Sequence, residues 1–188
     1  MGFLETLFGR TPVPKAREDQ IFAITTAWLT LQTAAGLEPC HRAGIVFRDL
    51  PAGRFDQLTA DVKQLIGLEG GETGMQLQEH RDQFGFDWLI LSGADVPDLT
   101  TALHGVAQSL MEQGLGDLLL AAVFRFEQQG RPVYWVYSYK QGTFYPFVPA
   151  GEHKRDNAEE LRQSAIAKGE LPVEPMLERW YALWDIPV

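Results

Sequence analysis

The chain has 188 residues, of which 45% are hydrophobic, and its 16 basic and 25 acidic residues give a formal charge of −9. This length and composition predict one domain with a substantial core, and the negative charge repels phosphate backbones, so we expect no nucleic-acid partner. The single cysteine, Cys40, excludes an internal disulfide framework. No secretory signal pattern and no apolar run near the roughly 20 residues of a membrane-spanning helix is found, so we expect a cytoplasmic protein.

The first ten residues, MGFLETLFGR, predict a short amphipathic arm that is followed by two prolines within residues 11–15. Its large apolar side chains fall on one side of a helix: Phe3, Leu4, Leu7 and Phe8. We therefore assign residues 1–15 to an arm and linker and residues 16–188 to a single domain. Two interpretations stay open, a terminus that packs loosely on the domain and a weak apolar contact with a membrane surface or a partner.

The chain between the arm and residue 114 predicts three helices and three strands. Apolar side chains recur at helical spacing, and a glycine follows each helix, in residues 19–35, 54–66 and 97–113. Alternating or continuous apolar patterns predict strands in residues 45–50, 75–81 and 86–92. The last two strands are close enough in the chain to form a hairpin.

Residues 118–148 predict three antiparallel strands joined at Gln129-Gly130 and Gln141-Gly142, because a glycine accepts the positive φ of a tight hairpin. In the middle strand one parity carries Val133, Trp135, Tyr137 and Tyr139, and the other carries Tyr134, Val136, Ser138 and Lys140. We expect the first set to be covered and the second set to be half exposed to water. Pro146 lacks the backbone donor of a central strand, so the third strand should lie at an edge.

Two further helices are predicted near the end of the chain. Asp156 can cap the first, whose apolar side is expected to consist of Ala158, Leu161, Ala165 and Ile166. Pro175 can begin the second, and its Trp180 and Trp184 should fix the C-terminal segment to the sheet. The resulting fold class is α+β, with one mainly antiparallel sheet of five or six strands packed by helices chiefly on one face.

No catalytic set is evident in the sequence. Cys40 and His41 are adjacent, but neighbours in sequence rarely meet in the geometry of an activated nucleophile. The four histidines lack the short spacing of zinc ligands, and we expect neither a metal nor a cofactor.

One polar and aromatic cluster stands out as a candidate binding edge: Tyr139, Lys140, Gly142, Tyr145, Arg155, Asp156 and Asn157. Exposed polar and aromatic residues near loops often carry recognition. The structural alternative is that Asp156 caps a helix, the cations neutralise nearby acids, and the tyrosines place their rings in the core with hydroxyls at its rim.

Several strings connect the chain to a known family. They are Tyr139-Lys140, residues 142–147 (GTFYPF), Pro149, residues 155–158 (RDNA), residues 171–175 (LPVEP) and Arg179-Trp180, together with the start MGFLETLFGR and residues 22–24 and 30–32. Over nearly its whole length the chain resembles the PspA-associated protein family PspAB. The resemblance implies a small soluble bacterial or archaeal protein linked with phage-shock protein A, a membrane-maintenance protein, and it implies no catalytic residues. The strings that carry the resemblance do not include Cys40.

Three hypotheses for function follow. The first is a non-enzymatic accessory protein of the phage-shock-protein-A envelope-stress system, which acts by protein–protein interaction and is at most peripheral at the inner face of the membrane. The second is an enzyme or small-ligand binder that uses a cleft beside Lys140, Arg155 and Asp156. The third is a secretion-chaperone-like module that binds peptides as a homodimer, which rests on analogy with other helix-flanked antiparallel sheets.

Overall fold

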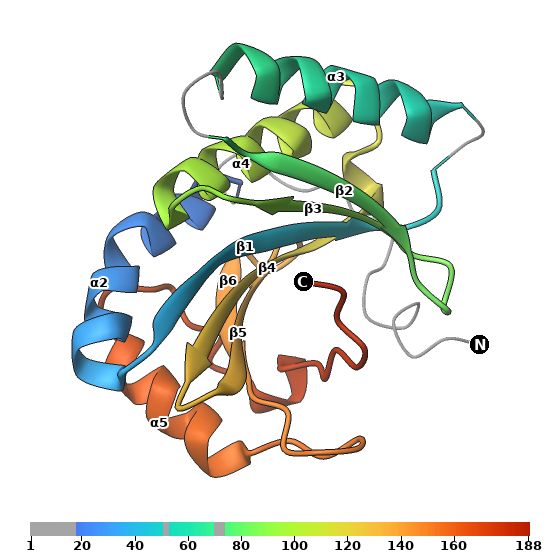
Figure 1. Cartoon of the computed structure of the whole chain (residues 1–188). Coiled ribbons are helices and arrows are strands. Elements are labelled where there is room, and N and C mark those ends of the chain that lie inside the picture. Colours follow the sequence, from blue (N-terminus) through green and yellow to red (C-terminus); the bar gives the residue numbers. More distant parts are fainter. Residues whose placement is uncertain (1–17, 51–52, 70–73) are drawn as a thin grey trace.

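The structure is a computed structural model that describes residues 18–50, 53–69 and 74–188. These residues form one α+β unit around a six-stranded sheet with the order β2-β3-β1-β4-β5-β6 (Figure 1). All neighbouring strands pair antiparallel. The predicted fold class is confirmed. The predicted arm, with Phe3, Leu4, Leu7 and Phe8, lies outside the described residues, so its boundary with the domain stays a prediction.

The strands are β1 (Glu38–Phe47), β2 (Gln76–Arg81), β3 (Asp87–Ser92), β4 (Leu119–Gln128), β5 (Arg131–Ser138) and β6 (Thr143–Phe147). Both predicted hairpin groups are confirmed, β2 with β3 and the succession β4, β5 and β6. β6, which contains Pro146, lies at an edge as predicted. β1 begins at Glu38, earlier than predicted. Its register with β4 is irregular between Pro39 and Ala43, and this part of the strand contains a proline, so alternation of apolar residues did not indicate it.

The helices are η1 (Asp19–Ala23), α2 (Ile24–Ala35), α3 (Arg54–Glu69), α4 (Val96–Glu112), η2 (Gly116–Leu118), α5 (Asn157–Ala167) and η3 (Leu177–Arg179). α2 ends at Gly36, whose φ of 71° is a left-handed conformation that glycine adopts without a side-chain clash. Asp95 caps the start of α4, and its carboxylate accepts a hydrogen bond from the backbone N of Asp98 at 2.9 Å. The helices predicted in residues 19–35, 54–66 and 97–113 are therefore confirmed.

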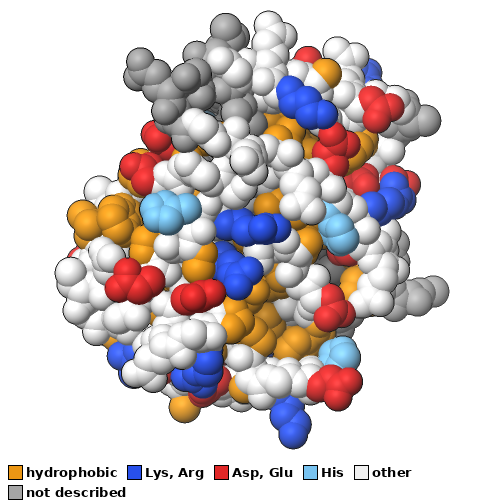
Figure 2. Space-filling view, viewed as in Figure 1, with side chains coloured by type: hydrophobic (Ala, Val, Ile, Leu, Met, Phe, Trp, Pro, Cys, Tyr) orange, Lys and Arg blue, Asp and Glu red, His pale blue; other side chains and the backbone are white. Residues whose placement is uncertain are grey.

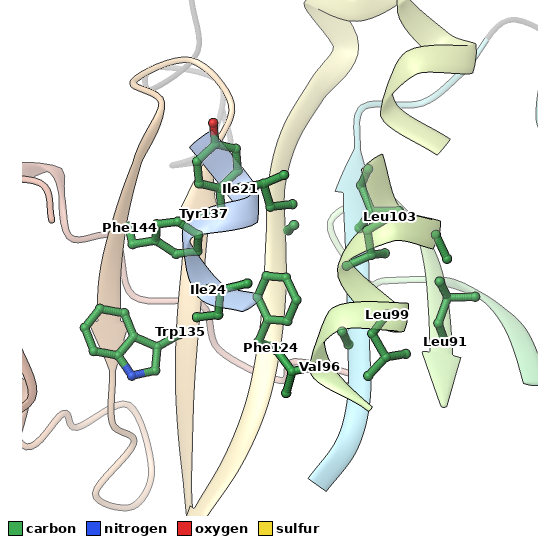
Figure 3. Packing of buried hydrophobic residues seen from close by; sticks show 14 of the residues in the cluster. Ile21, Ile24, Leu91, Val96, Leu99, Leu103, Phe124, Trp135, Tyr137 and Phe144 are labelled. Carbon is green, nitrogen blue, oxygen red and sulfur yellow. The ribbon is translucent and has the colours of Figure 1, made fainter. Parts of the chain in front are cut away.

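One face of the sheet packs against the helices and forms the larger core, here called the helix-side core. Figure 3 shows part of it: Ile21, Ile24, Leu91, Val96, Leu99, Leu103, Phe124, Trp135, Tyr137 and Phe144. The rings of Tyr137 and Phe144 lie 4.8 Å apart, and Tyr139 meets Tyr137 edge to face at 5.2 Å. The β5 parity predicted to be covered is thus buried against the helices.

The opposite face was predicted to be half exposed, and that prediction is wrong. Tyr134 and Val136 are buried in a second core, which residues 176–188 cover from the other side. We call this segment the strap and this cluster the strap-side core; the latter contains Val46, Trp88, Ile90, Val123, Tyr134, Val136, Tyr145 and Phe147 from the sheet and Trp180, Leu183 and Val188 from the strap. In Figure 1 the helices lie outside the curve of the sheet and the red C-terminal segment lies inside it.

The strap is not the predicted helix, because only Leu177–Arg179 forms a single 3-10 turn. Arginine side chains, and not helical amides, donate to the backbone oxygens of Trp180, Pro187 and Val188. Asp185 also adopts a left-handed φ of 58°, which a helix cannot contain. The prediction that Trp180 and Trp184 fix this segment to the sheet is nevertheless confirmed by their packing on the strap-side core.

The apolar side predicted for α5 is also wrong in large part. Leu161 is 50% exposed, and Ala158 and Ala165 are exposed as well. The buried side chains of this helix are Glu160 and Gln163, with Ala167. Hydrogen bonds to buried polar groups, which hydrophobic periodicity cannot detect, orient α5.

Candidate functional site

The seven residues of the predicted binding edge lie in four separate places. Tyr139 is buried in the helix-side core, and Tyr145 is buried in the strap-side core on the other face. Lys140 and Gly142 lie in the turn between β5 and β6. The three other members, Arg155, Asp156 and Asn157, lie past the far end of β6, where residues 149 and 155 form a bridge. Their role in binding stays a prediction.

Arg155 joins three elements at the end of β6. Its Nε donates to both carboxylate oxygens of Glu160 on α5, at 3.0 and 2.8 Å. Its Nη1 donates to the backbone oxygen of Trp180 in the strap at 2.6 Å, and its guanidinium lies 5.5 Å from the ring centre of Phe147. Arg155 is thus the link between the sheet, α5 and the strap.

Glu160 is the buried partner in this arrangement, with a side chain that is only 2% exposed. It also accepts a hydrogen bond from the backbone N of Val148 at 2.9 Å. Burial raises the pKa of the Glu160 carboxyl above its ordinary value, and the hydrogen bonds and charge of Arg155 act in the opposite direction. Removal of Arg155 would leave this carboxyl with a single backbone donor.

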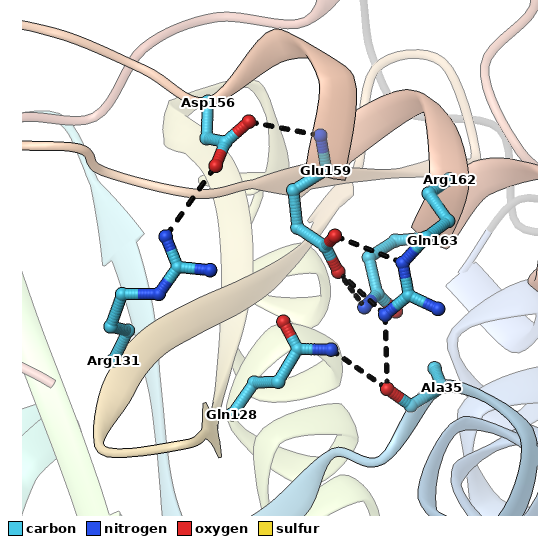
Figure 4. Close-up of polar contacts among 7 residues, drawn as sticks. All are labelled: Ala35, Gln128, Arg131, Asp156, Glu159, Arg162 and Gln163. Carbon is cyan, nitrogen blue, oxygen red and sulfur yellow. Dashed lines mark hydrogen bonds and ion pairs between the residues drawn. The ribbon is translucent and has the colours of Figure 1, made fainter.

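Asp156 is the N-cap of α5, as predicted. Its carboxylate accepts from the backbone N of Glu159 at 3.0 Å and pairs with Arg131 of β5 at 3.5 Å (Figure 4). Asn157 is the exposed first residue of the helix. The contacts of Asp156 therefore match the structural alternative, in which this residue caps a helix.

Side chains from β4 and α5 meet at the C-terminal end of α2 (Figure 4). The backbone oxygen of Ala35 accepts from Gln128 at 2.8 Å and from Arg162 at 3.1 Å. Arg162 also holds Glu159, and these hydrogen bonds lower the pKa of the Glu159 carboxyl. A cation at a helix C-terminus interacts favourably with its dipole, so this network fixes α2 against α5.

Tyr145 is enclosed between the sheet and the strap. Its ring lies 6.4 Å from that of Tyr181, edge to face. Burial raises the pKa of the Tyr145 phenol well above its ordinary value, while the nearby Arg155 opposes that shift. The hydroxyl therefore stays protonated at neutral pH.

Two arginines hold the end of the strap, and the predicted site did not include them. Arg42 of β1 donates to the backbone oxygen of Pro187 at 2.9 Å, and Arg125 of β4 donates to that of Val188 at 3.2 Å. Both arginines share a strand parity with residues of the strap-side core, which is a signal that strand periodicity could have provided. Gly44 lies beneath the strap, since a Cβ there would approach Cγ2 of Val188 to 2.6 Å.

Cys40 and His41 have separate surroundings. Burial raises the pKa of the Cys40 thiol above its ordinary value, which disfavours a reactive thiolate. Nδ1 of His41 lies 3.1 Å from the backbone oxygen of Ala94. Within residues 18–50, 53–69 and 74–188, no group of three or more His, Cys, Asp or Glu side chains is placed to hold a metal ion.

Fold and contacts together define a small α+β protein whose single sheet carries helices on one face and a non-helical strap on the other. No helix in the described part of the chain is long and apolar enough to cross a membrane. The chain matches the family PspAB, described as PspA associated protein B, over residues 1–188, and it belongs to that family. It matches none of the curated proteins and none of the solved structures with which it was compared.

Proposed function

We propose that this protein is a non-enzymatic accessory protein of the phage-shock-protein-A envelope-stress and membrane-maintenance system, and that it acts by binding a PspA-family protein. The observation that carries this proposal is the family match, which spans residues 1–188 and whose description names association with PspA. The match covers the whole chain and therefore does not favour one segment as the contact surface.

The contacts of Arg155 and Asp156 favour a structural role over a catalytic one. Arg155 is held by Glu160 and by the strap, and Asp156 caps α5. A catalytic acid or base must reach a substrate atom within hydrogen-bond distance, whereas these two groups already hold parts of the fold together.

We also propose that the protein lies on the cytoplasmic side of the membrane and that residues 1–10 of the arm contact the membrane surface weakly through their apolar side chains. Arg10, Lys15 and Arg17 flank the apolar side chains of this arm in an otherwise acidic chain. Basic residues beside a short apolar face favour an anionic membrane surface, and the resulting attachment is weak and reversible.

The test is affinity capture of the tagged full-length chain from cells under envelope stress. We expect a PspA homologue to be enriched over an unrelated tagged protein of similar size and charge. A second capture with a variant that lacks residues 1–10 separates protein contact from shared membrane, because PspA should remain while lipid is lost. Failure to enrich either PspA or membrane material would lead us to abandon this function.

A further inference from the structure

The strap packs on the sheet without joining its backbone hydrogen-bond ladder. Among the residues that the structure describes, none outside the segment makes a backbone-to-backbone hydrogen bond with residues 182–188. The preceding segment differs, because the backbone N of Phe144 donates to Pro172 at 2.8 Å and that of Glu174 donates to Phe144 at 2.8 Å. The strap therefore lies on the sheet without being part of its hydrogen-bonded ladder.

Three of the polar contacts that hold the strap are made to its backbone oxygens, whereas Gln83 donates to the side-chain carboxylate of Asp185 at 2.9 Å. Arg155, Arg42 and Arg125 donate to the oxygens of residues 180, 187 and 188 at 2.6, 2.9 and 3.2 Å. The oxygens of Trp180 and Pro187 are peptide carbonyls, which every segment carries, so these two contacts do not depend on the side chains of the strap. A different segment of similar shape can accept the same hydrogen bonds.

Apolar and aromatic contacts provide the selectivity. Trp184 meets Phe147 edge to face at 5.3 Å, and the Tyr181 and Tyr145 rings lie 6.4 Å apart. At the end of the strap, the absence of a side chain at Gly44 makes room for Val188. The face therefore fits a segment with aromatic residues and an aliphatic residue above Gly44. Figure 2 shows hydrophobic side chains on this side of the molecule, next to Lys or Arg side chains near its centre.

The charge of the face favours an acidic segment. No carboxylate of the described residues lies within ion-pair distance of Arg42, and its buried Nε has no hydrogen-bond partner among them. Arg125 pairs only at 3.4 Å with Glu127. A carboxylate beside Arg42 would form a charge-assisted hydrogen bond, which is stronger than one to a neutral carbonyl.

We propose that the sheet face lined by Arg42, Gly44, Arg125 and Phe147 is a peptide-docking groove, that the strap occupies it within the chain, and that an acidic segment of a protein partner, rich in aromatic residues, replaces the strap. This inference rests on the proposed function, because it assigns the surface by which the accessory protein holds its partner. The strap acts as a tethered competitor, whose effective concentration is on the order of millimolar, and so it sets the affinity that a partner must exceed.

The probe for this groove is a labelled peptide with the sequence of residues 176–188, added to the full-length protein and followed by fluorescence anisotropy. We expect weak binding to the wild type and binding at least about tenfold tighter to Trp184→Ser, because a loosened strap competes less. Val188→Ser loosens the strap at its C-terminal end, and this variant replaces Trp184→Ser in the titration if Trp184→Ser does not fold. A scrambled peptide is the control, and Gly44→Val added to either variant should abolish binding.

A second pair of probes tests the charge of the ligand. The same peptide carrying Pro187→Glu should bind the loosened protein several-fold more tightly than the peptide carrying Pro187→Lys, and Arg42→Gln in the protein should remove this difference. Equal binding of the two peptides before that substitution would overturn the acidic preference.

Two outcomes would overturn the groove itself. If neither loosened variant binds the peptide better than its scrambled form, the strap is a permanent part of the core. If the loosened variants form a concentration-dependent dimer that the peptide dissociates, the occupant is the strap of a second copy and not a partner. The titration contains no PspA, so its failure is distinguishable from failure of the affinity capture.

Discussion

Replacement of Arg155 by methionine should destabilise the protein mainly through Glu160. The substitution keeps an unbranched apolar stem but removes both hydrogen bonds to the carboxylate, at 2.8 and 3.0 Å, and the bond to Trp180. Loss of one partner from a buried pair costs about 3–5 kcal/mol, because the other charge is left uncompensated. Arg155 is 22% exposed and Glu160 keeps its bond from Val148, so we expect the lower end, about 3 kcal/mol.

The loss should depend on pH in a direction that the burial of Glu160 fixes. Its pKa in the folded protein is already raised above the ordinary value of 4.5, and Arg155 is the group that opposes this rise. Without Arg155 the folded pKa rises further, so between the unfolded and the folded pKa the native state binds more protons than the unfolded state. The destabilisation should therefore be largest at pH 8 and should decrease as the pH falls toward 5.

Urea unfolding, followed by tryptophan fluorescence at several pH values, measures both effects. The control is Arg131→Met, since Arg131 is 52% exposed and pairs with Asp156 only at 3.5 Å; it should cost about 1 kcal/mol or less at every pH. The double variant Arg155→Met with Glu160→Gln should lose the pH dependence. A loss below 1 kcal/mol for Arg155→Met, or one that does not change with pH, would refute a structural role for this pair.

Three further predictions concern other parts of the chain. Burial lowers the pKa of His104, and the charge of Asp19 opposes this shift. The unfolded state therefore takes up a proton at a higher pH than the folded state, so wild-type stability should fall as the pH drops below about 6.5. Melting curves of His104→Phe should show a smaller decrease. Asp156→Ala should lose about 1 kcal/mol of unfolding free energy through the α5 cap, whereas Asp156→Asn, which can still accept from the helix amide, should retain most of it in the same measurement. Deletion of residues 1–10 should abolish a modest, salt-sensitive cosedimentation with anionic vesicles and leave the melting temperature unchanged, and a large fall in that temperature would instead place the arm in the core.

Periodicity predicted much of the helix-side core because α4 and β5 each bury a regular set of apolar side chains. Leu99 and Leu103 recur at helical spacing, and Trp135 and Tyr137 alternate along β5. Turn glycines and Pro146 then fixed the order of the last three strands and the edge position of β6. These patterns depend on residues that are close in the sequence, so they can be interpreted without knowledge of the tertiary structure.

The second face escaped the same reasoning for a physical reason. Its β5 parity mixes Tyr134 and Val136 with Ser138 and Lys140, which is the pattern of a half-exposed surface. The apolar residues of the strap, which covers this face, recur at helical spacing. Its backbone is nevertheless not helical, and its oxygens accept hydrogen bonds from arginines that are distant in the sequence. Likewise, α5 is oriented by buried Glu160 through Arg155, a partner that hydrophobic spacing does not reveal.

The helices on one face of the sheet and the strap on the other should consequently respond differently to displacement from the sheet. α4 contacts both β1 and β4, so displacing it would break this packing. The described residues outside the strap make no backbone-to-backbone hydrogen bond with residues 182–188, whose exchange requires only side-chain contacts and a few arginine bonds to be replaced. Local opening is easiest where few backbone hydrogen bonds must break, so we expect the strap face to open more readily than the rest of the sheet. An accessory protein that binds by exposing an apolar face would use that side of its sheet.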